Sequence, residues 1–324
     1  MSYPVSPPPR TVSRRALLGA AGLAAAALAV PALAAPARAA SGTTDRGYGV
    51  FLPAYPGNLD AVRTAGAAVG RMPELVTWYV AWSTKAAFPL AQVQEVTGLG
   101  ALPEITWEPW DPARGTAPST YSMASIAAGR HDSYIRSWAR AAAAWGRPVR
   151  LRFAHESNGS WYPWAVGVNG TTASQYAAAW RRVVTLFRSA GARNVQFVWC
   201  PNIPFAGTPA LASIYPGDAY VDVVGLDGYN WGTSQDWSQW GTFTDVFGAG
   251  VNELRSFTAK PLVLGEVGCA EAGGDKAAWI ADMFAVLDAH PEVRGFTWFN
   301  AAKETDWRVE STQASLDAFR TGVA

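Results

Sequence analysis

The sequence has few cysteines, and this excludes some classes of protein. Only Cys200 and Cys269 occur in 324 residues, so a disulfide scaffold is excluded and the fold must rest on an apolar core. One bridge between these two cysteines stays open, because sequence does not place their Cα atoms within reach. No C-x-x-C motif occurs, so a dithiol redox enzyme is disfavoured.

Histidine is also scarce, and no metal or organic cofactor is expected. The three histidines are His131, His155 and His290, and none has neighbours with the spacing of metal ligands. The first apolar run, YGVFLPAYPG, contains no G-x-G-x-x-G. A dinucleotide-binding sheet would ordinarily carry that phosphate loop after its first strand.

Charged residues are few as well, at 16% of the chain, and the formal net charge is +1. A nucleic-acid partner is not indicated, because phosphate binding requires clustered basic side chains and no cluster appears. From Gly47 onward no linker, charge block or repeat interrupts the chain,. We therefore expect one catalytic domain over residues 41–324, and a monomer.

The first forty residues have the three parts of an export signal. A basic stretch at 13–15 precedes an apolar run at 16–33, and small residues surround the Ala37-Arg38-Ala39 segment,. A membrane anchor is the alternative, since about twenty apolar residues span a bilayer, but Pro31 and Pro36 favour cleavage and a mature protein without a membrane span. The arginine pair in SRRALLG resembles a twin-arginine signal, which predicts a secreted bacterial protein; Sec export is the other possibility.

Eight short apolar runs alternate with amphipathic or alanine-rich stretches after this leader. The runs begin at Tyr48, Glu74, Leu102, Val149, Val195, Val221, Pro261 and Gly295. The clearest helical stretches are 58–66, 132–145, 174–190, 245–259 and 276–289. Strand and helix repeated eight times over about 275 residues predict an α/β fold, a single (β/α)8 TIM barrel. A doubly wound sheet is the main rival.

Polar and aromatic residues concentrate at one end of the predicted strands. The third to eighth runs end in TWEPW, AHESNGSWYPW, WCPN, DGYNW, GEVG and WFN, whereas their starts are plain apolar residues. Barrel active sites form at the C-terminal ends of the strands. Glu156, at the end of the fourth run, and Glu266, at the end of the seventh, should therefore face one mouth. Glycoside hydrolysis needs such a pair, one carboxyl protonated and one ionised. For either residue alone, a solvated or salt-bridged strand-end Glu is the alternative.

These motifs resemble glycoside hydrolase family 26, a group of retaining endo-glycanases on a (β/α)8 barrel. The resemblance rests on RFAHESNGSWYPW, GLDGYNW, LVLGEVG and FTWFN, in that order along the chain. It implies that Glu156 is the acid/base and Glu266 the nucleophile. It also implies that His155 belongs to the site and that Tyr229 bonds the nucleophile. Ser157 stands where the family often has Met, and we expect little effect.

The resemblance implies a β-linked polysaccharide as substrate. The family includes β-1,4-mannanases, mixed-linkage β-1,3-1,4-glucanases and β-1,3-xylanases, and the catalytic motifs leave mannan and mixed-linkage glucan equally favoured. A secreted carbohydrate-binding protein that has lost activity on the same barrel is the alternative from another class.

Tryptophan is abundant, with sixteen residues. Because sugar rings stack their C–H faces on indole, we expect substrate contacts at Trp161, Trp231 and Trp298, while Trp107 is balanced between substrate contact and core packing.

Four polar residues near the predicted strand ends complete the interpretation. Two roles are equally favoured for Asn158, Asp227 and Glu108: hydrogen bonding to sugar hydroxyls and capping of a loop. Arg152 lies four residues before Glu156 and so faces the barrel interior,. A buried guanidinium requires a carboxylate, and Glu104 or Glu74 is the predicted partner.

Overall fold

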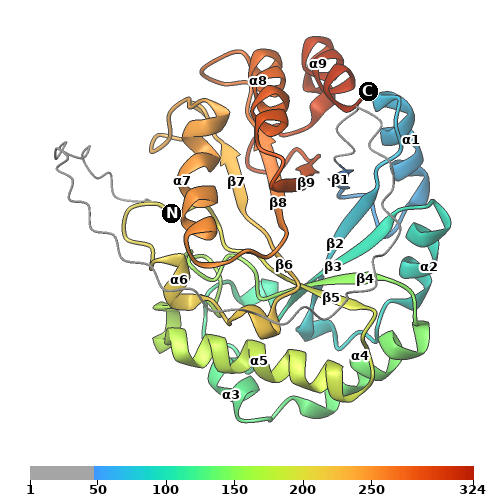
Figure 1. The fold of residues 1–324 in the computed structure, drawn as a ribbon, viewed down its shortest axis with the longest axis vertical. Coiled ribbons are helices and arrows are strands. Elements are labelled where there is room, and N and C mark those ends of the chain that lie inside the picture. The colour runs from blue at the N-terminus through green and yellow to red at the C-terminus, as the bar shows by residue number, and fades with distance from the viewer. Residues whose placement is uncertain (1–46) are drawn as a thin grey trace, which may run out of the picture. The chain divides into compact units, whose positions relative to one another are not determined.

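The computed structural model describes residues 47–324, which form a closed parallel barrel with helices outside it (Figure 1). The strands are β1 (Gly47–Phe51), β2 (Leu75–Ala81), β3 (Leu102–Glu108), β4 (Val149–Phe153), β5 (Val195–Trp199), β6 (Val223–Val224), β7 (Asp227–Asn230), β8 (Leu262–Cys269) and β9 (Val293–Phe299). Their order is β6-β5-β4-β3-β2-β1-β9-β8-β7, and a further pairing of β6 with β8 closes the sheet.

The barrel has eight strand positions, because β6 and β7 are two halves of one strand interrupted at residues 225–226. A Cβ on Gly225 would lie 2.4 Å from the Cys200 sulfur, so only glycine permits the close approach at this break. Each of the eight predicted runs overlaps the strand expected of it, and the prediction of a (β/α)8 barrel is confirmed.

The helices surround the strands (Figure 1). They are α1 (Leu59–Val69), α2 (Leu90–Gly98), α3 (Met123–Ala127), α4 (Asp132–Trp145), α5 (Ala173–Ser189), α6 (Leu211–Ile214), α7 (Phe243–Phe257), α8 (Lys276–Ala289) and α9 (Gln313–Val323). Local sequence fixes the starts of the two longest of these: Thr172 before α5 and Thr242 before α7 each form a capping box with the residue three positions later,.

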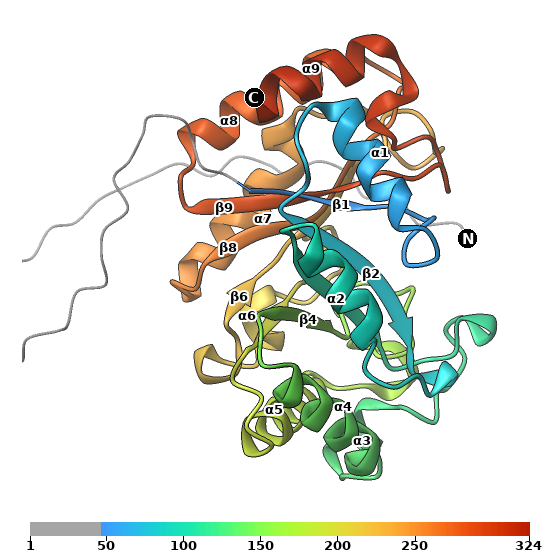
Figure 2. The ribbon, with the colours of Figure 1, turned by 90° about the vertical axis from the view of Figure 1, so that its right-hand side faces the viewer.

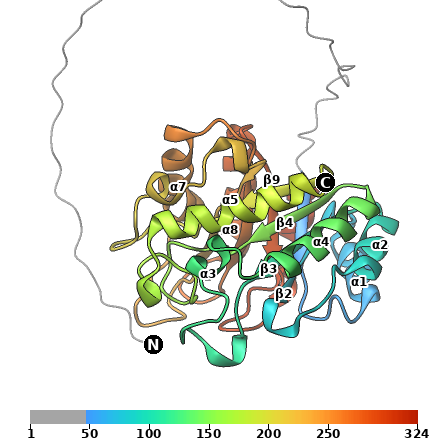
Figure 3. The same cartoon turned by 90° about the horizontal axis from the view of Figure 1, so that it is seen from below.

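Neighbouring helices pack against each other as well as on the sheet. On one side α8 and α9 lie together over β9 (Figure 2), and the rings of Phe284 and Phe319 meet edge to face at 5.7 Å. On another side α4 and α5 lie together (Figure 3), where Arg182 donates hydrogen bonds of 2.7 and 2.8 Å to Asp132. This layer excludes water from the outer face of the strands.

Among residues 47–324 no helix is both long and apolar enough to cross a bilayer. The predicted export signal at 1–40 lies outside the described residues.

Cys200 and Cys269 are both free and buried. The Cys200 thiol donates to Asp227 at 3.0 Å and the Cys269 thiol to the Ala270 carbonyl at 3.4 Å, so the disulfide that the sequence left open is not formed.

Candidate active site

A strained turn presents Glu156 at the barrel mouth. Strand β4 ends at Phe153, and Ala154 and Glu156 then adopt left-handed backbone conformations, with φ of 44° and 49°. Such conformations cost about 1–3 kcal/mol each for residues other than glycine, and they cluster at functional sites. The turn breaks the two-residue alternation of the strand, so His155 and Glu156 can both face the site.

Hydrogen bonds from three sides hold this turn in place. The Tyr176 hydroxyl donates to the Ala154 carbonyl at 3.0 Å, and the Trp164 indole N–H donates to the His155 carbonyl at 2.7 Å. The Glu156 backbone N–H donates to the carbonyl of Cys200, just after β5, at 2.7 Å. Tertiary contacts therefore compensate for the local strain.

The Glu156 side chain is 7% exposed and has one hydrogen-bond donor, the Trp161 indole N–H, 2.6 Å from Oε2. Burial raises the pKa of Glu156 to about 8, the charge of Glu266 raises this pKa too, and the Trp161 hydrogen bond lowers it. At neutral pH Glu156 is therefore protonated and can donate a proton.

Glycine at position 159 makes the Trp161 contact possible. A Cβ there would lie 2.6 Å from the indole ring, a distance at which the ring would have to move. Gly159 therefore keeps Trp161 close enough to bond Glu156, and the substrate contact expected of Trp161 stays a prediction.

Glu266 lies within β8, beside Asp227 of β7 in the strand register. Its carboxylate accepts hydrogen bonds from the Tyr79 hydroxyl at 2.5 Å, from the Tyr229 hydroxyl, and from Nη2 of Arg152 at 2.5 Å. Three converging donors suit an ionised carboxylate, which can only accept hydrogen bonds. Tyr229 is thus bonded to Glu266 as the resemblance implied, whereas the sequence analysis missed Tyr79.

Arg152 is fully buried and links two acidic residues. Its Nη1 donates to both oxygens of Asp227 at 3.0 and 2.9 Å, and its Nε donates to Thr106 at 2.9 Å. Burial opposes the charge of Arg152, but Asp227 and Glu266 outweigh it and raise the pKa of the guanidinium well above its usual value. The guanidinium therefore stays charged beside Glu266.

The predicted partners of Arg152, Glu104 and Glu74, were wrong. Glu104 pairs with residue 150, one pleat closer to the start of the strand, and Glu74 instead bonds Arg71 near the surface. The Arg152 side chain extends toward the C-terminal end of the barrel, where it meets Asp227 and Glu266.

Glycine precedes the acidic residue of β8 for a steric reason. A Cβ on Gly265 would lie 2.5 Å from both the Asp227 carboxylate and the Cys200 sulfur. Only a residue without a side chain leaves room for the pair of Arg152 and Asp227 at this level of the barrel.

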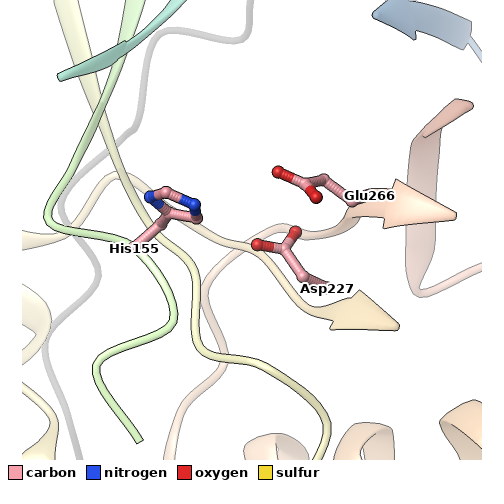
Figure 4. Close-up of side chains that lie close together, drawn as sticks. All are labelled: His155, Asp227 and Glu266. Carbon is pink, nitrogen blue, oxygen red and sulfur yellow. The ribbon is translucent and has the colours of Figure 1, made fainter. Parts of the chain in front are cut away.

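The His155 ring and the carboxylates of Asp227 and Glu266 face a common space (Figure 4), with ligand atoms within 4.8 Å of one another. Three such groups could hold a metal ion, but Arg152 already donates to both carboxylates, so its guanidinium supplies the positive charge there. Burial, followed by the charges of Arg152 and Lys303, lowers the pKa of His155 well below its usual value. The imidazole is neutral, and its buried Nδ1 has no hydrogen-bond partner among residues 47–324.

Asn158 does not present its amide to the site, so the sugar contact that the sequence left open for it is wrong. Its Nδ2 donates to the Asn202 carbonyl at 2.8 Å, and its Oδ1 accepts from the Asn202 N–H at 2.9 Å. The side chain is 2% exposed. Asn158 therefore ties the loop after β4 to the loop after β5, which is the loop-holding role weighed against sugar binding.

Trp107 and Trp298 do not line the mouth either: of the two roles left open for Trp107 the structure shows core packing, and the substrate contact predicted for Trp298 was wrong. They are 0% and 1% exposed. Trp107 stacks on Trp138 of α4 at 4.5 Å, and Trp298 meets Phe319 of α9 at 5.4 Å. Both side chains point outward from their strands into the helix layer, because neighbouring strand residues face opposite sides.

The residues that follow these tryptophans take the inward direction. Phe299 stacks on Phe51 of β1 at 4.5 Å and meets Tyr229 at 5.7 Å. Glu108 is 6% exposed, and burial raises its pKa to about 7. The two-residue period of a strand therefore places Glu108 and Phe299 on the inner face of the barrel, and Trp107 and Trp298 on the outer face.

A separate aromatic cluster surrounds the Glu266 side of the mouth. Trp231 is half-buried, and its ring meets that of Trp307 at 4.8 Å and that of Trp237 at 5.2 Å. Trp307 lies after β9 and was not predicted. Trp231 therefore lies next to Tyr229, and the substrate contact expected of it stays a prediction.

Comparisons with known proteins agree with this geometry. Residues 128–269 match the model of glycosyl hydrolase family 26. The chain is 38% identical to endoglucanase H of Acetivibrio thermocellus over 270 residues, which are 81% of this chain and 29% of that protein. It is 30% identical to a mannan endo-1,4-β-mannosidase of Bacillus subtilis over 162 residues, 47% of this chain and 39% of that protein. The chain thus spans less than half the length of either relative.

Solved structures share the fold. A modular endo-β-1,4-mannanase from Cellulomonas fimi has a TM-score of 0.64 at 18% identity, covering 86% of this chain and 70% of that one. A β-mannanase from Bacteroides ovatus has a TM-score of 0.62 at 20% identity, covering 86% and 88%. At these identities the likeness shows the barrel alone. The family model and the relatives carry the assignment further, and the chain belongs to glycosyl hydrolase family 26.

Proposed function

We propose that this protein is a retaining endo-β-glycanase in which Glu156 is the acid/base and Glu266 the nucleophile. The observation that carries the proposal is the unequal state of two carboxyl groups at one mouth. Burial raises the pKa of Glu156 to about 8, with a contribution from the charge of Glu266. Glu266 accepts three hydrogen bonds. A protonated and an ionised carboxyl are the pair that double displacement requires.

In the first step a Glu266 oxygen attacks the anomeric carbon while Glu156 gives its proton to the glycosidic oxygen. The bond from carbon to that oxygen breaks, the leaving sugar departs as an alcohol, and a glycosyl ester of Glu266 remains. Arg152 and the two tyrosine hydroxyls hold the attacking carboxylate in one orientation, so little reorganisation is needed.

The second step uses the same two residues in exchanged roles. Once esterified, Glu266 no longer carries the charge that helps to raise the pKa of Glu156. The pKa of Glu156 therefore falls, and its ionised form can accept a proton from water. The water oxygen then attacks the anomeric carbon and displaces Glu266. Two inversions return the sugar to its starting configuration.

Neutral His155 is suited to binding a sugar hydroxyl. Within the described part of the chain its Nδ1 has no hydrogen-bond partner, and its ring lies beside Asp227 and Glu266. A neutral imidazole adds no positive charge near Glu156, so it does not oppose the protonated state of that residue. Substrate contact by the half-buried Trp231 is part of the same proposal.

For the substrate we propose β-1,4-mannan or mixed-linkage β-1,3-1,4-glucan. The name of the relative matched over 81% of the chain favours a glucan, and the names of several relatives matched over shorter stretches favour mannan. Reducing-end assays on mannan, lichenan, barley β-glucan and β-1,3-xylan separate these possibilities. Retention is checked by NMR of the anomeric protons of the first products.

A carbohydrate-binding protein without activity is the second candidate, since aromatic side chains border the mouth. Isothermal titration with the same glycans distinguishes the two, because binding heat without new reducing ends would overturn the enzyme assignment.

We also propose export through residues 1–40. Replacing Arg14 and Arg15 by Lys should retain the protein in the cells if the twin-arginine route is used, and secretion unchanged by that replacement would favour Sec export.

A further inference from the structure

One exposed aromatic side chain lies next to the acid side of the site. Among residues 47–324 the large apolar side chains that are exposed are Met72, Leu90, Phe205 and Trp237. Phe205, 43% exposed, is in the loop after β5, at the same end of the barrel as Glu156. Its ring lies 6.0 Å from that of Trp161 with an angle of 20° between the planes.

Trp161 connects this ring to the chemistry. Its indole N–H donates to Oε2 of Glu156 at 2.6 Å, while its ring is nearly parallel to that of Phe205. The aromatic cluster around Glu266 is a different one, made of Tyr79, Tyr229 and their neighbours. The mouth therefore has separate aromatic surfaces beside the two carboxyl groups.

The loop that carries Phe205 is fixed at both ends of its turn. The Phe205 N–H donates to the Thr208 hydroxyl at 3.2 Å, and that hydroxyl donates back to the Phe205 carbonyl at 2.8 Å. The bonds between Asn158 and Asn202 anchor the start of the loop. An exposed ring on an ordered backbone loses little conformational freedom when a ligand covers it.

We propose that Phe205 and Trp161 form an aromatic shelf for the leaving-group sugars, with Phe205 under the outer sugar. The proposal rests on the proposed function, since the acid must contact the oxygen that departs with the leaving group. The shelf begins at Trp161, which bonds the acid Glu156, and ends at Phe205. It therefore lies along the part of the glycan that departs with the leaving group. The occupant is a pyranose unit of a β-linked glycan, whose C–H face stacks on an aromatic ring.

The test compares four variants on two hexasaccharides, mannohexaose and one from barley β-glucan, each with ¹⁸O at the reducing end so that mass spectrometry maps the cleaved bond. Phe205→Ala and Phe205→Leu remove the aromatic face, and Phe205→Trp retains it. Met72→Ala removes an exposed apolar side chain before β2, at the opposite end of the barrel.

Phe205→Ala and Phe205→Leu should raise KM about 2- to 10-fold, the size of one aromatic stacking contribution. They should also move cleavage toward bonds that leave fewer sugars on the departing side. Phe205→Trp should restore both readouts, and Met72→Ala should match the wild type. An unchanged KM and cleavage map in Phe205→Leu would overturn the shelf, and a shift in the opposite direction would overturn its place on the leaving-group side.

Titration of the hexasaccharides separates this inference from the proposed function. A wild-type protein that binds both sugars without cleaving either would refute the enzyme assignment and the leaving-group role. In that case weaker binding to Phe205→Ala would still support sugar binding at this ring. Equal binding to Phe205→Ala and the wild type would refute sugar binding at Phe205 too.

Discussion

Glu156 and Glu266 are the same residue type at one barrel mouth, yet their surroundings differ in almost every respect. Glu156 follows its strand on a left-handed turn and has one hydrogen-bond donor. Glu266 lies inside its strand and accepts bonds from two phenols and a guanidinium. The difference teaches that the number of donors and nearby charges, not the residue type, assigns the two proposed roles.

The largest expected effect comes from removing the carboxylate of Glu266, which accepts more hydrogen bonds than that of Glu156. Glu266→Ala should lower kcat on polysaccharide by about 10⁴- to 10⁶-fold, the size of effect caused by removing a covalent nucleophile. Reducing-end assays measure this loss, and an unchanged hexasaccharide affinity serves as the control for folding. A residual rate within tenfold of the wild type would show that Glu266 is not the nucleophile.

Glu156→Ala should lower kcat by about 10²- to 10⁴-fold on polysaccharide, the usual contribution of general acid–base catalysis. The loss should be much smaller on a dinitrophenyl glycoside, whose leaving group needs no proton, and added azide should give a glycosyl azide with retained configuration. Glu266→Ala should do neither. Identical behaviour of the two variants would remove the difference in role between the two residues.

Arg152→Met tests the charge balance on the Glu266 side alone. It leaves Asp227 and Glu266 buried without their cation, so the free energy of unfolding should fall by about 3–5 kcal/mol, measured by urea denaturation. Arg63→Met removes an exposed ion pair with Asp60 and should change stability by about 0–1 kcal/mol. Equal effects of both variants would mean that the buried pair does not support the site.

The smallest effect concerns the pH dependence of the Glu156 side. A general acid must be protonated, so kcat/KM should fall as pH rises through about 8, the pKa of Glu156,. The Trp161 hydrogen bond lowers this pKa, so Trp161→Phe should move the alkaline limb to higher pH. An alkaline limb that stays fixed, or moves down, would show that another group sets it.

The strands and the helix faces were predictable because each depends on a local pattern. Apolar runs with polar ends give eight strands, and capping residues such as Thr172 and Thr242 begin their helices. Because all strands of a parallel barrel end at one face, the same pattern also placed Glu156 and Glu266 at one mouth. The direction of single side chains was harder: Trp298 was predicted at the mouth and is buried in the core, and Trp107 was left open between the two.

The sequence by itself determined the barrel and the candidate carboxyl pair, whereas the state of that pair depends on the tertiary structure. Tyr79 bonds Glu266 across 187 residues of sequence, and Arg152 bonds it across 114. The burial and the charges that raise the pKa of Glu156 come from several strands and loops at once. No local pattern encodes these contacts, because desolvation and Coulomb interactions depend on distances that exist only after the barrel has closed.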